Sequence, residues 1–136
     1  PGRLDAELKD ADPRAVIAAV KARGLLTSCF FCAFDHARLV AVHRHCREAP
    51  LMIRRQDIPS VDPACAELPA HIVEFDLRDD LSEIEAVRAR GPRAMVAYLG
   101  RALKVFDDLI DTRPDLLNLH FPFLFRVHLA TRRGVS

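Results

Sequence analysis

Three charged residues alternate with apolar ones near the start of the chain. Asp5, Glu7 and Lys9 are spaced two apart, and because successive side chains of a strand point to opposite faces, they would share one face of a strand. A carboxylate suits a divalent cation such as Mg²⁺ or Ca²⁺, and a neighbouring ammonium group suits the remaining oxygens of a phosphate. The spacing therefore indicates a phosphoester site, with a solvated edge strand or a simple Glu–Lys ion pair as the alternative.

The elements that would position these residues follow from the apolar pattern. Strand-like runs alternate with helical segments, and we expect strands at 3–9, 26–34, 51–53, 71–77, 94–99 and 116–121. Such alternation with short connections predicts right-handed crossovers and a parallel sheet. Six parallel strands fit an open, doubly wound sheet or part of a closed barrel, because a complete (β/α)₈ barrel usually needs about 250 residues.

Local signals mark where helices begin and which side they bury. Asp12 followed by Pro13 is typical of an N-cap and a first helical residue, and Ser82 with Glu85 has the spacing of a capping box. In the helix that follows the fifth strand, a period of 3.6 residues predicts that Leu103 lies on the inner side.

Composition bounds the class of protein. The chain has 20 Lys and Arg against 19 Asp and Glu, with no long block of like charge, and this argues against nucleic acid as a partner. The most apolar segment, 25–34, is much shorter than the roughly 20 residues of a bilayer span, so we expect no membrane helix. Segment 56–69 is rich in proline and predicts a long loop within one domain spanning 1–136.

The four cysteines occur in a chain with ample apolar residues, so we expect reduced thiols and a cytoplasmic location. Cys29 and Cys32 have a spacing that zinc ligands use, and His43 and Cys46 follow. Residues three apart on a strand face opposite sides, so Cys29 and Cys32 could not share one ion without a bulge. We therefore expect no zinc site.

Longer motifs carry a resemblance. The segment "RLDAELKDADPRAVIAAVKARGLLTSCFFCAFDHARLVAVHRHCREAP" resembles the glycerophosphodiester phosphodiesterase family, in which a strand ending Glu-x-Lys precedes a helix and a strand ending Ser-Phe-Asp or Ser-Phe-Ser. Glu7-Leu8-Lys9 matches the first motif, and Cys32-Ala33-Phe34-Asp35 is a degenerate form of the second. The segment "GPRAMVAYLGRALKVFDDLIDTRPDLLNLHFPFLF" is similar to the last two barrel strands of that family.

This resemblance implies an α/β fold, a partial (β/α) TIM-type barrel with about six parallel strands, and a metal-assisted phosphoric diester hydrolase. Glu7 would be a ligand of Mg²⁺ or Ca²⁺, and Lys9 would be the catalytic contact to the phosphoryl group of a small phosphodiester substrate. Phe34 falls in the second motif and would bind substrate.

Two further substrate-binding candidates are Tyr98 and His120. Tyr98 could stack on a ligand or be packed. His120 shares strand parity with Asn118, as Asp76 does with Glu74, so these side chains could line the barrel mouth or serve only as hydrogen-bonding neighbours and solvated residues.

The departures from the family pattern are equally specific. The family carries two histidine motifs and a Glu-x-Asp metal motif together near its amino end, and this set is not found in these 136 residues. Leu119-His120-Phe121-Pro122 stands where Thr-Asp-x-Pro is usual. We therefore expect this chain alone to be incomplete or inactive as a hydrolase. The alternative is a non-catalytic binding or assembly module, a dimerising pseudoenzyme that pairs through open sheet edges.

Overall fold

The computed structural model describes residues 4–58 and 68–134. Within them, six strands alternate with helices, as the apolar pattern predicted. The strands are β1 (Leu4–Glu7), β2 (Cys29–Cys32), β3 (Met52–Arg54), β4 (Ile72–Asp76), β5 (Arg93–Tyr98) and β6 (Leu116–Leu119). The α-helices are α1 (Pro13–Ala22), α2 (His36–His45), α3 (Ile84–Ala89), α4 (Leu103–Thr112) and α5 (Pro122–Arg132).

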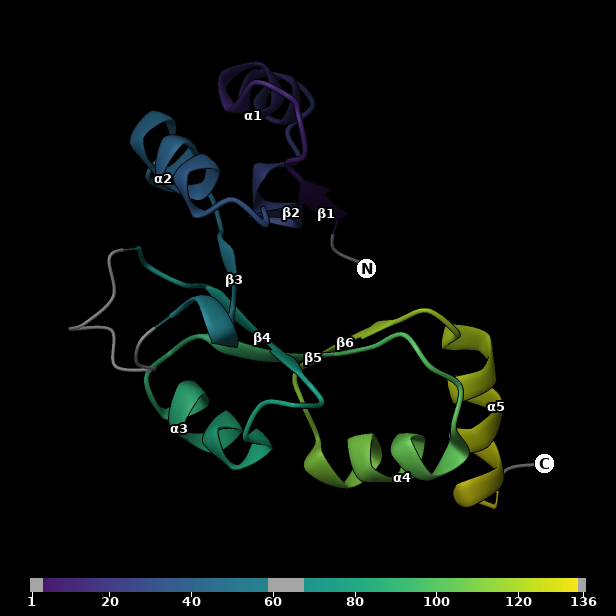
Figure 1. The fold of residues 1–136 in the computed structure, drawn as a ribbon. Coiled ribbons are helices and arrows are strands. Elements are labelled where there is room, and N and C mark those ends of the chain that lie inside the picture. Colours follow the sequence, from purple (N-terminus) through teal and green to yellow (C-terminus); the bar gives the residue numbers. More distant parts are fainter. Residues whose placement is uncertain (1–3, 59–67, 135–136) are drawn as a thin grey trace.

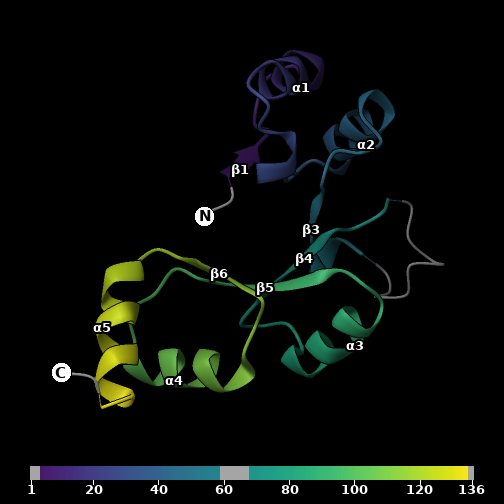
Figure 2. The same ribbon diagram turned by 180° about the vertical axis from the view of Figure 1, so that it is seen from behind.

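All strand pairs are parallel, which confirms the predicted sheet type. The strands β1 and β2 form one pair, and β3 to β6 form a four-stranded sheet in chain order. A single bridge between Phe31 and Leu51 joins the two sheets, and the Phe31 backbone N–H donates to the Pro50 carbonyl at 2.8 Å. The result is a curved series of six strands with its helices on the outer side and β1 and β6 as its edges (Figures 1 and 2).

Side chains alternate between the two faces of each strand, so one set of buried residues lies between the sheet and the helices and another lies on the inner face of the sheet. Outward-facing strand residues form clusters with residues of the helices. Phe31 clusters with Leu39 of α2, and Phe75 clusters with Phe106 of α4. Inward-facing residues form a smaller buried cluster made of Phe30, Cys32, Met52, Ile72 and Met95. The inner face is therefore apolar towards the amino ends of the strands, and this closes the floor beneath the site described below.

Helix capping agrees with the sequence in one place and departs from it in another. Asp12 caps α1, its side chain accepting a hydrogen bond from the Arg14 N–H at 3.1 Å, with Pro13 as the first helical residue. The predicted capping box at Ser82 is wrong. Asp80 is the cap instead, accepting from the Ser82 N–H at 2.9 Å and from the Ser82 hydroxyl at 2.6 Å, and a short 3₁₀ turn, Leu81–Glu83, precedes α3.

Other boundaries also shift. The predicted strand 26–34 begins with a 3₁₀ turn, η1 (Leu26–Ser28), and is extended only over Cys29–Cys32. A second 3₁₀ turn, η2 (Arg55–Asp57), overlaps the start of the predicted loop 56–69, of which residues 59–67 lie outside the described residues. None of the helices in the described ranges combines the length and the apolar character needed to cross a bilayer.

Phe106 anchors the last two helices to the sheet. Its ring is fully buried and meets Tyr98 and Phe125 edge-on, with ring centroids 5.7 and 5.3 Å apart. The imidazole of His128 on α5 adds a tilted contact at 6.0 Å. By contrast, Leu103, which the sequence predicted to be inside, is half exposed at the start of α4.

We expect Phe106→Ala to lower the free energy of unfolding by about 3–5 kcal/mol, because it removes the ring that α4, α5 and β5 share. Phe123→Ala is the matched control. Phe123 is 76% exposed on α5, and its loss should change stability by no more than about 0.5 kcal/mol. Urea denaturation of both variants measures the difference, and similar losses would show that Phe106 is not the anchor.

Candidate functional site

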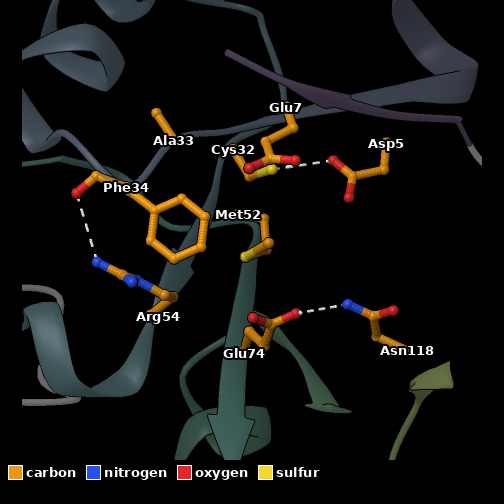
Figure 3. Close-up of a pocket in the computed structure, with 9 residues that line it drawn as sticks. All are labelled: Asp5, Glu7, Cys32, Ala33, Phe34, Met52, Arg54, Glu74 and Asn118. Carbon is orange, nitrogen blue, oxygen red and sulfur yellow. Dashed lines mark hydrogen bonds between the residues drawn. The ribbon is translucent and has the colours of Figure 1, made fainter. Parts of the chain in front are cut away.

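A pocket of about 140 Å³ opens on the inner face where the strands end (Figure 3). Its side chains come from five strands (β1, β2, β3, β4 and β6) and the segment after β2: Asp5, Glu7, Cys32, Ala33, Phe34, Met52, Arg54, Glu74 and Asn118. We call it the inner pocket. Carboxyl ends of parallel strands are where barrel enzymes place their chemistry.

Glu7 lines the inner pocket, and Lys9 is outside the lining but pairs with Glu7. The Lys9 ammonium group is 3.5 Å from a carboxylate oxygen of Glu7, and the Lys9 side chain is 73% exposed. An exposed ion pair of this kind contributes little to stability.

A thiol–carboxylate contact joins β1 to β2 inside the pocket. The Cys32 thiol donates to Asp5 at 3.0 Å. Burial raises the pKa of the Cys32 thiol, and the hydrogen bond to Asp5 raises it further, so the thiol stays protonated and acts as a donor. Cys29 faces the opposite side in the outer core, as strand parity required.

Glu74 and Asn118 form the opposite wall of the inner pocket (Figure 3). The Asn118 amide donates to a Glu74 carboxylate oxygen at 3.2 Å, across a separation of 44 residues in the chain. Burial raises the pKa of Glu74, although the Asn118 hydrogen bond opposes that change. Strand parity predicted that both residues could reach the mouth, and the structure makes them a hydrogen-bonded pair there.

Arg54 and Phe34 close one side of the pocket. The Arg54 guanidinium lies 4.5 Å from the centre of the Phe34 ring, donates to Asp57 at 2.6 Å and reaches the Phe34 carbonyl at 3.4 Å. Sequence reasoning missed Arg54 because it ended the third strand at Ile53. One more residue of strand would have placed Arg54 on the same face as Met52.

Tyr98 and His120 do not line the inner pocket. The Tyr98 ring packs against Phe106, and its hydroxyl accepts a hydrogen bond from the Ala102 N–H at 2.9 Å. The ring also lies against Gly100, where a Cβ would be 2.5 Å from the Tyr98 hydroxyl oxygen. His120 is exposed and stacks on Phe121 with ring centroids 4.9 Å apart.

The pocket offers an incomplete set of metal ligands. Within residues 4–58 and 68–134, no three His, Cys, Asp or Glu side chains converge in a way that could hold an ion. Asp5 is engaged by the Cys32 thiol, and the raised pKa of Glu74 disfavours its charged form. The described residues therefore do not fit a complete cation site.

No protein-family model and no curated protein sequence matches this chain. Solved structures do match it. A glycerophosphodiester phosphodiesterase from Agrobacterium tumefaciens str. C58 superposes with a TM-score of 0.82 and 26% identity, over 94% of this chain and 56% of that one. One from Parabacteroides distasonis ATCC 8503 gives a TM-score of 0.76 at 18% identity, over 96% and 58% of the two chains.

A third similar structure is an Oleispira antarctica phosphodiesterase in complex with the product sn-glycerol-3-phosphate, with a TM-score of 0.65 and 16% identity over 93% of this chain and 55% of that one. The chain thus spans about half the length of the structures that it matches. The predicted fold class, an α/β partial barrel of TIM type with about six parallel strands, is confirmed. The resemblance that the motifs carried is confirmed as well: this chain is similar to about half of a glycerophosphodiester phosphodiesterase.

Proposed function

We propose that this chain supplies part of the phosphodiester site of a glycerophosphodiester phosphodiesterase-type hydrolase. The observation that supports this most directly is the pairing of Glu7 and Lys9 at the end of β1, beside the inner pocket. A mixed pair of charges at a strand's carboxyl end is suited to an anionic ester accompanied by a cation. The substrate would be a small diester of glycerol phosphate.

Lys9 is the catalytic residue in this proposal. Its ammonium group would pair with phosphoryl oxygens and offset the charge that accumulates on them during attack at phosphorus. Phe34 and Arg54 would hold the substrate from the other side of the mouth, since both line the inner pocket. Tyr98 and His120 remain proposed substrate contacts outside the inner pocket.

Glu7 would be the contribution of this chain to a divalent cation, Mg²⁺ or Ca²⁺. Such an ion, when bound, polarises a phosphoryl oxygen as a Lewis acid. Because the described residues provide an incomplete ligand set, the remaining ligands and the acid–base groups would have to come from elsewhere. We therefore propose that this chain alone binds phosphodiesters but does not hydrolyse them.

Two further proposals concern the cellular location of the chain and the class of its ligand. The described cysteines, Cys29, Cys32 and Cys46, are free thiols, and this supports a cytoplasmic location. The near balance of basic and acidic residues supports a small anionic ligand rather than nucleic acid as the partner.

A second candidate function is a non-catalytic assembly module. Among the described strands, β1 pairs only with β2 and β6 only with β5, so each leaves a row of backbone groups open to another chain. Two copies could satisfy these edges by pairing.

Lys9→Met tests the first proposal. We expect it to weaken binding of the methyl ester of sn-glycerol 3-phosphate about three- to tenfold, because one exposed charge-assisted contact is lost. Lys104→Met is the control, since Lys104 is exposed on α4 and outside the inner-pocket lining. Isothermal titration calorimetry on the full chain, with and without Mg²⁺, measures both. Equal affinities for wild type and Lys9→Met would remove Lys9 from the site.

Glu74→Gln tests the electrostatics of the pocket. The pKa of Glu74 is raised above its ordinary 4.5, so its favourable contribution is complete below that value and is lost as the pH rises through the raised pKa. Glutamine keeps an acceptor for Asn118 without the charge. We therefore expect Glu74→Gln to be more stable than wild type at pH 7–8, with no such gain at pH 4, in urea denaturation.

Glu83→Gln is the control with the opposite sign. The hydrogen bond from Arg55 lowers the pKa of Glu83, so its contribution is present above the ordinary 4.5 and is lost as the pH falls through the lowered pKa. This variant should be less stable than wild type at neutral pH. A loss of stability in Glu74→Gln at pH 7–8 would contradict the assignment of Glu74 as a desolvated carboxylate.

Sedimentation velocity tests the assembly module. If open edges are its function, we expect a dimer that persists on dilution to micromolar concentration, together with no affinity for the methyl ester. A monomer over the whole concentration range would contradict the assembly role.

A further inference from the structure

A second, larger pocket adjoins the inner pocket over the ends of β4 and β5. It has a volume of about 590 Å³ and shares Phe34, Arg54, Glu74 and Asn118 with the inner pocket. This volume falls within the roughly 300–1,000 Å³ typical of small-molecule sites. We call it the outer pocket. A ligand held at Glu7 and Lys9 could extend into it without leaving the protein surface.

Apolar side chains at the rim of the outer pocket are exposed to solvent. Phe34, Leu77 and Leu99 all line it, with 72%, 38% and 67% of their surfaces accessible. Each stands in the segment that directly follows a strand, namely β2, β4 or β5. Several large apolar side chains exposed around one hollow mark a place where an apolar partner binds.

The charged groups that line the same pocket already have partners. Asp76 receives two hydrogen bonds from the Arg78 guanidinium, at 2.9 and 3.2 Å, and Asp79 accepts from the Asp76 N–H at 2.7 Å. Arg54 donates to Asp57, and Glu74 accepts from Asn118. The charges of the outer pocket are therefore engaged with one another, whereas its apolar rim is exposed, and a charged head group would have to displace an existing partner there.

Phe34, Leu77 and Leu99 do not lie at the open edges of the sheet. The strands β2, β4 and β5 each have a neighbour on both sides, by a ladder or by the bridge at Phe31. A further strand could pair only beside β1 or β6, so it would not add a neighbour to the strands that precede Phe34, Leu77 and Leu99. Phe121 and Phe123 lie next to the β6 edge and are not part of the outer-pocket rim.

We propose that the outer pocket binds an alkyl or acyl chain, an inference that rests on the proposed function. The substrate class is then an amphiphilic phosphodiester, in which the phosphate lies at the inner pocket and one of its two alcohol groups carries the apolar chain. Leu77 and Leu99 are the residues that set this specificity. The wall beside Leu99 is completed by Ala97 and the Tyr98 ring.

A homologous series of ligands tests this. Methyl, butyl and octyl esters of sn-glycerol 3-phosphate, each below its micelle concentration, are titrated into the full chain by calorimetry. Complete burial of one methylene is worth about fourfold in affinity, and in an open pocket we expect about twofold for each of the first few. The octyl ester should therefore bind at least about tenfold more tightly than the methyl ester.

Matched leucine variants locate the effect. Leu99→Asn and Leu77→Asn should reduce the ratio of octyl to methyl affinity to below about threefold. Leu103→Asn is the control, because Leu103 is 50% exposed nearby but does not line the outer pocket, and it should keep the wild-type ratio.

The outcomes separate the two proposals. If the methyl ester binds and depends on Lys9 but the octyl ester gains less than about twofold, the chain-binding pocket is refuted and the phosphodiester site stands. If Leu103→Asn lowers the ratio as much as Leu99→Asn does, the outer pocket is likewise refuted as the location. If no ester binds in a Lys9-dependent way, the proposed function itself fails.

Discussion

The strict alternation of side chains along parallel strands is the constraint on which the rest of this molecule depends. On the inner face, Phe30, Met52 and Ile72 form a buried apolar layer. Two residues further along the same strands come Cys32, Arg54 and Glu74, which line the inner pocket. The register sets Met52 beside Ile72 and Arg54 beside Glu74, so each layer runs across strands at one height. The polar layer lies at the mouth, where solvent reaches it, and the apolar layer lies beneath, so neither sheet face carries a polar group deep in the core.

The polar layer gathers like charges at one place, which disfavours folding. Asp5, Glu7 and Glu74 bring three carboxyl groups to one small pocket, and each is offset separately, by the Cys32 thiol, by Lys9 and by Asn118. Asp5 and Glu7 are exposed, whereas Glu74 is half-buried, and an apolar side chain of similar size would stabilise the fold more than a half-buried acid. Burial raises the pKa of Glu74, because removal from water disfavours the charged form of a carboxyl group.

The strands and the faces of their side chains could be predicted from the sequence, because they follow from periodicity. The ends of the elements and the exposure of single residues could not, because they depend on tertiary neighbours. Six strands and the shared face of Asp5 and Glu7 follow from a period of two, which any strand must obey. The ends of the elements do not, because they are set by tertiary contacts. The predicted third strand ended at Ile53, one residue before its end in the structure, so Arg54 was not predicted as a site residue. Ser82 and Asp80 are both common N-cap residues, and the structure uses Asp80. Leu103 is exposed although its position in the helical period is an inner one. Helical periodicity gives the direction of a side chain but not whether a neighbouring element covers it.

The joint between β2 and β3 governs the geometry of the inner pocket. One bridge, at Phe31 and Leu51, connects the two sheets, while every other neighbouring pair forms a longer ladder. The inner pocket spans that joint, with Asp5, Glu7 and Cys32 on one side and Arg54 on the other. Its width therefore depends on the least extensive strand contact in the sheet. A phosphodiester that contacted Lys9 and Arg54 at once would tie the two sheets together, because its binding free energy would be available only when the joint is closed.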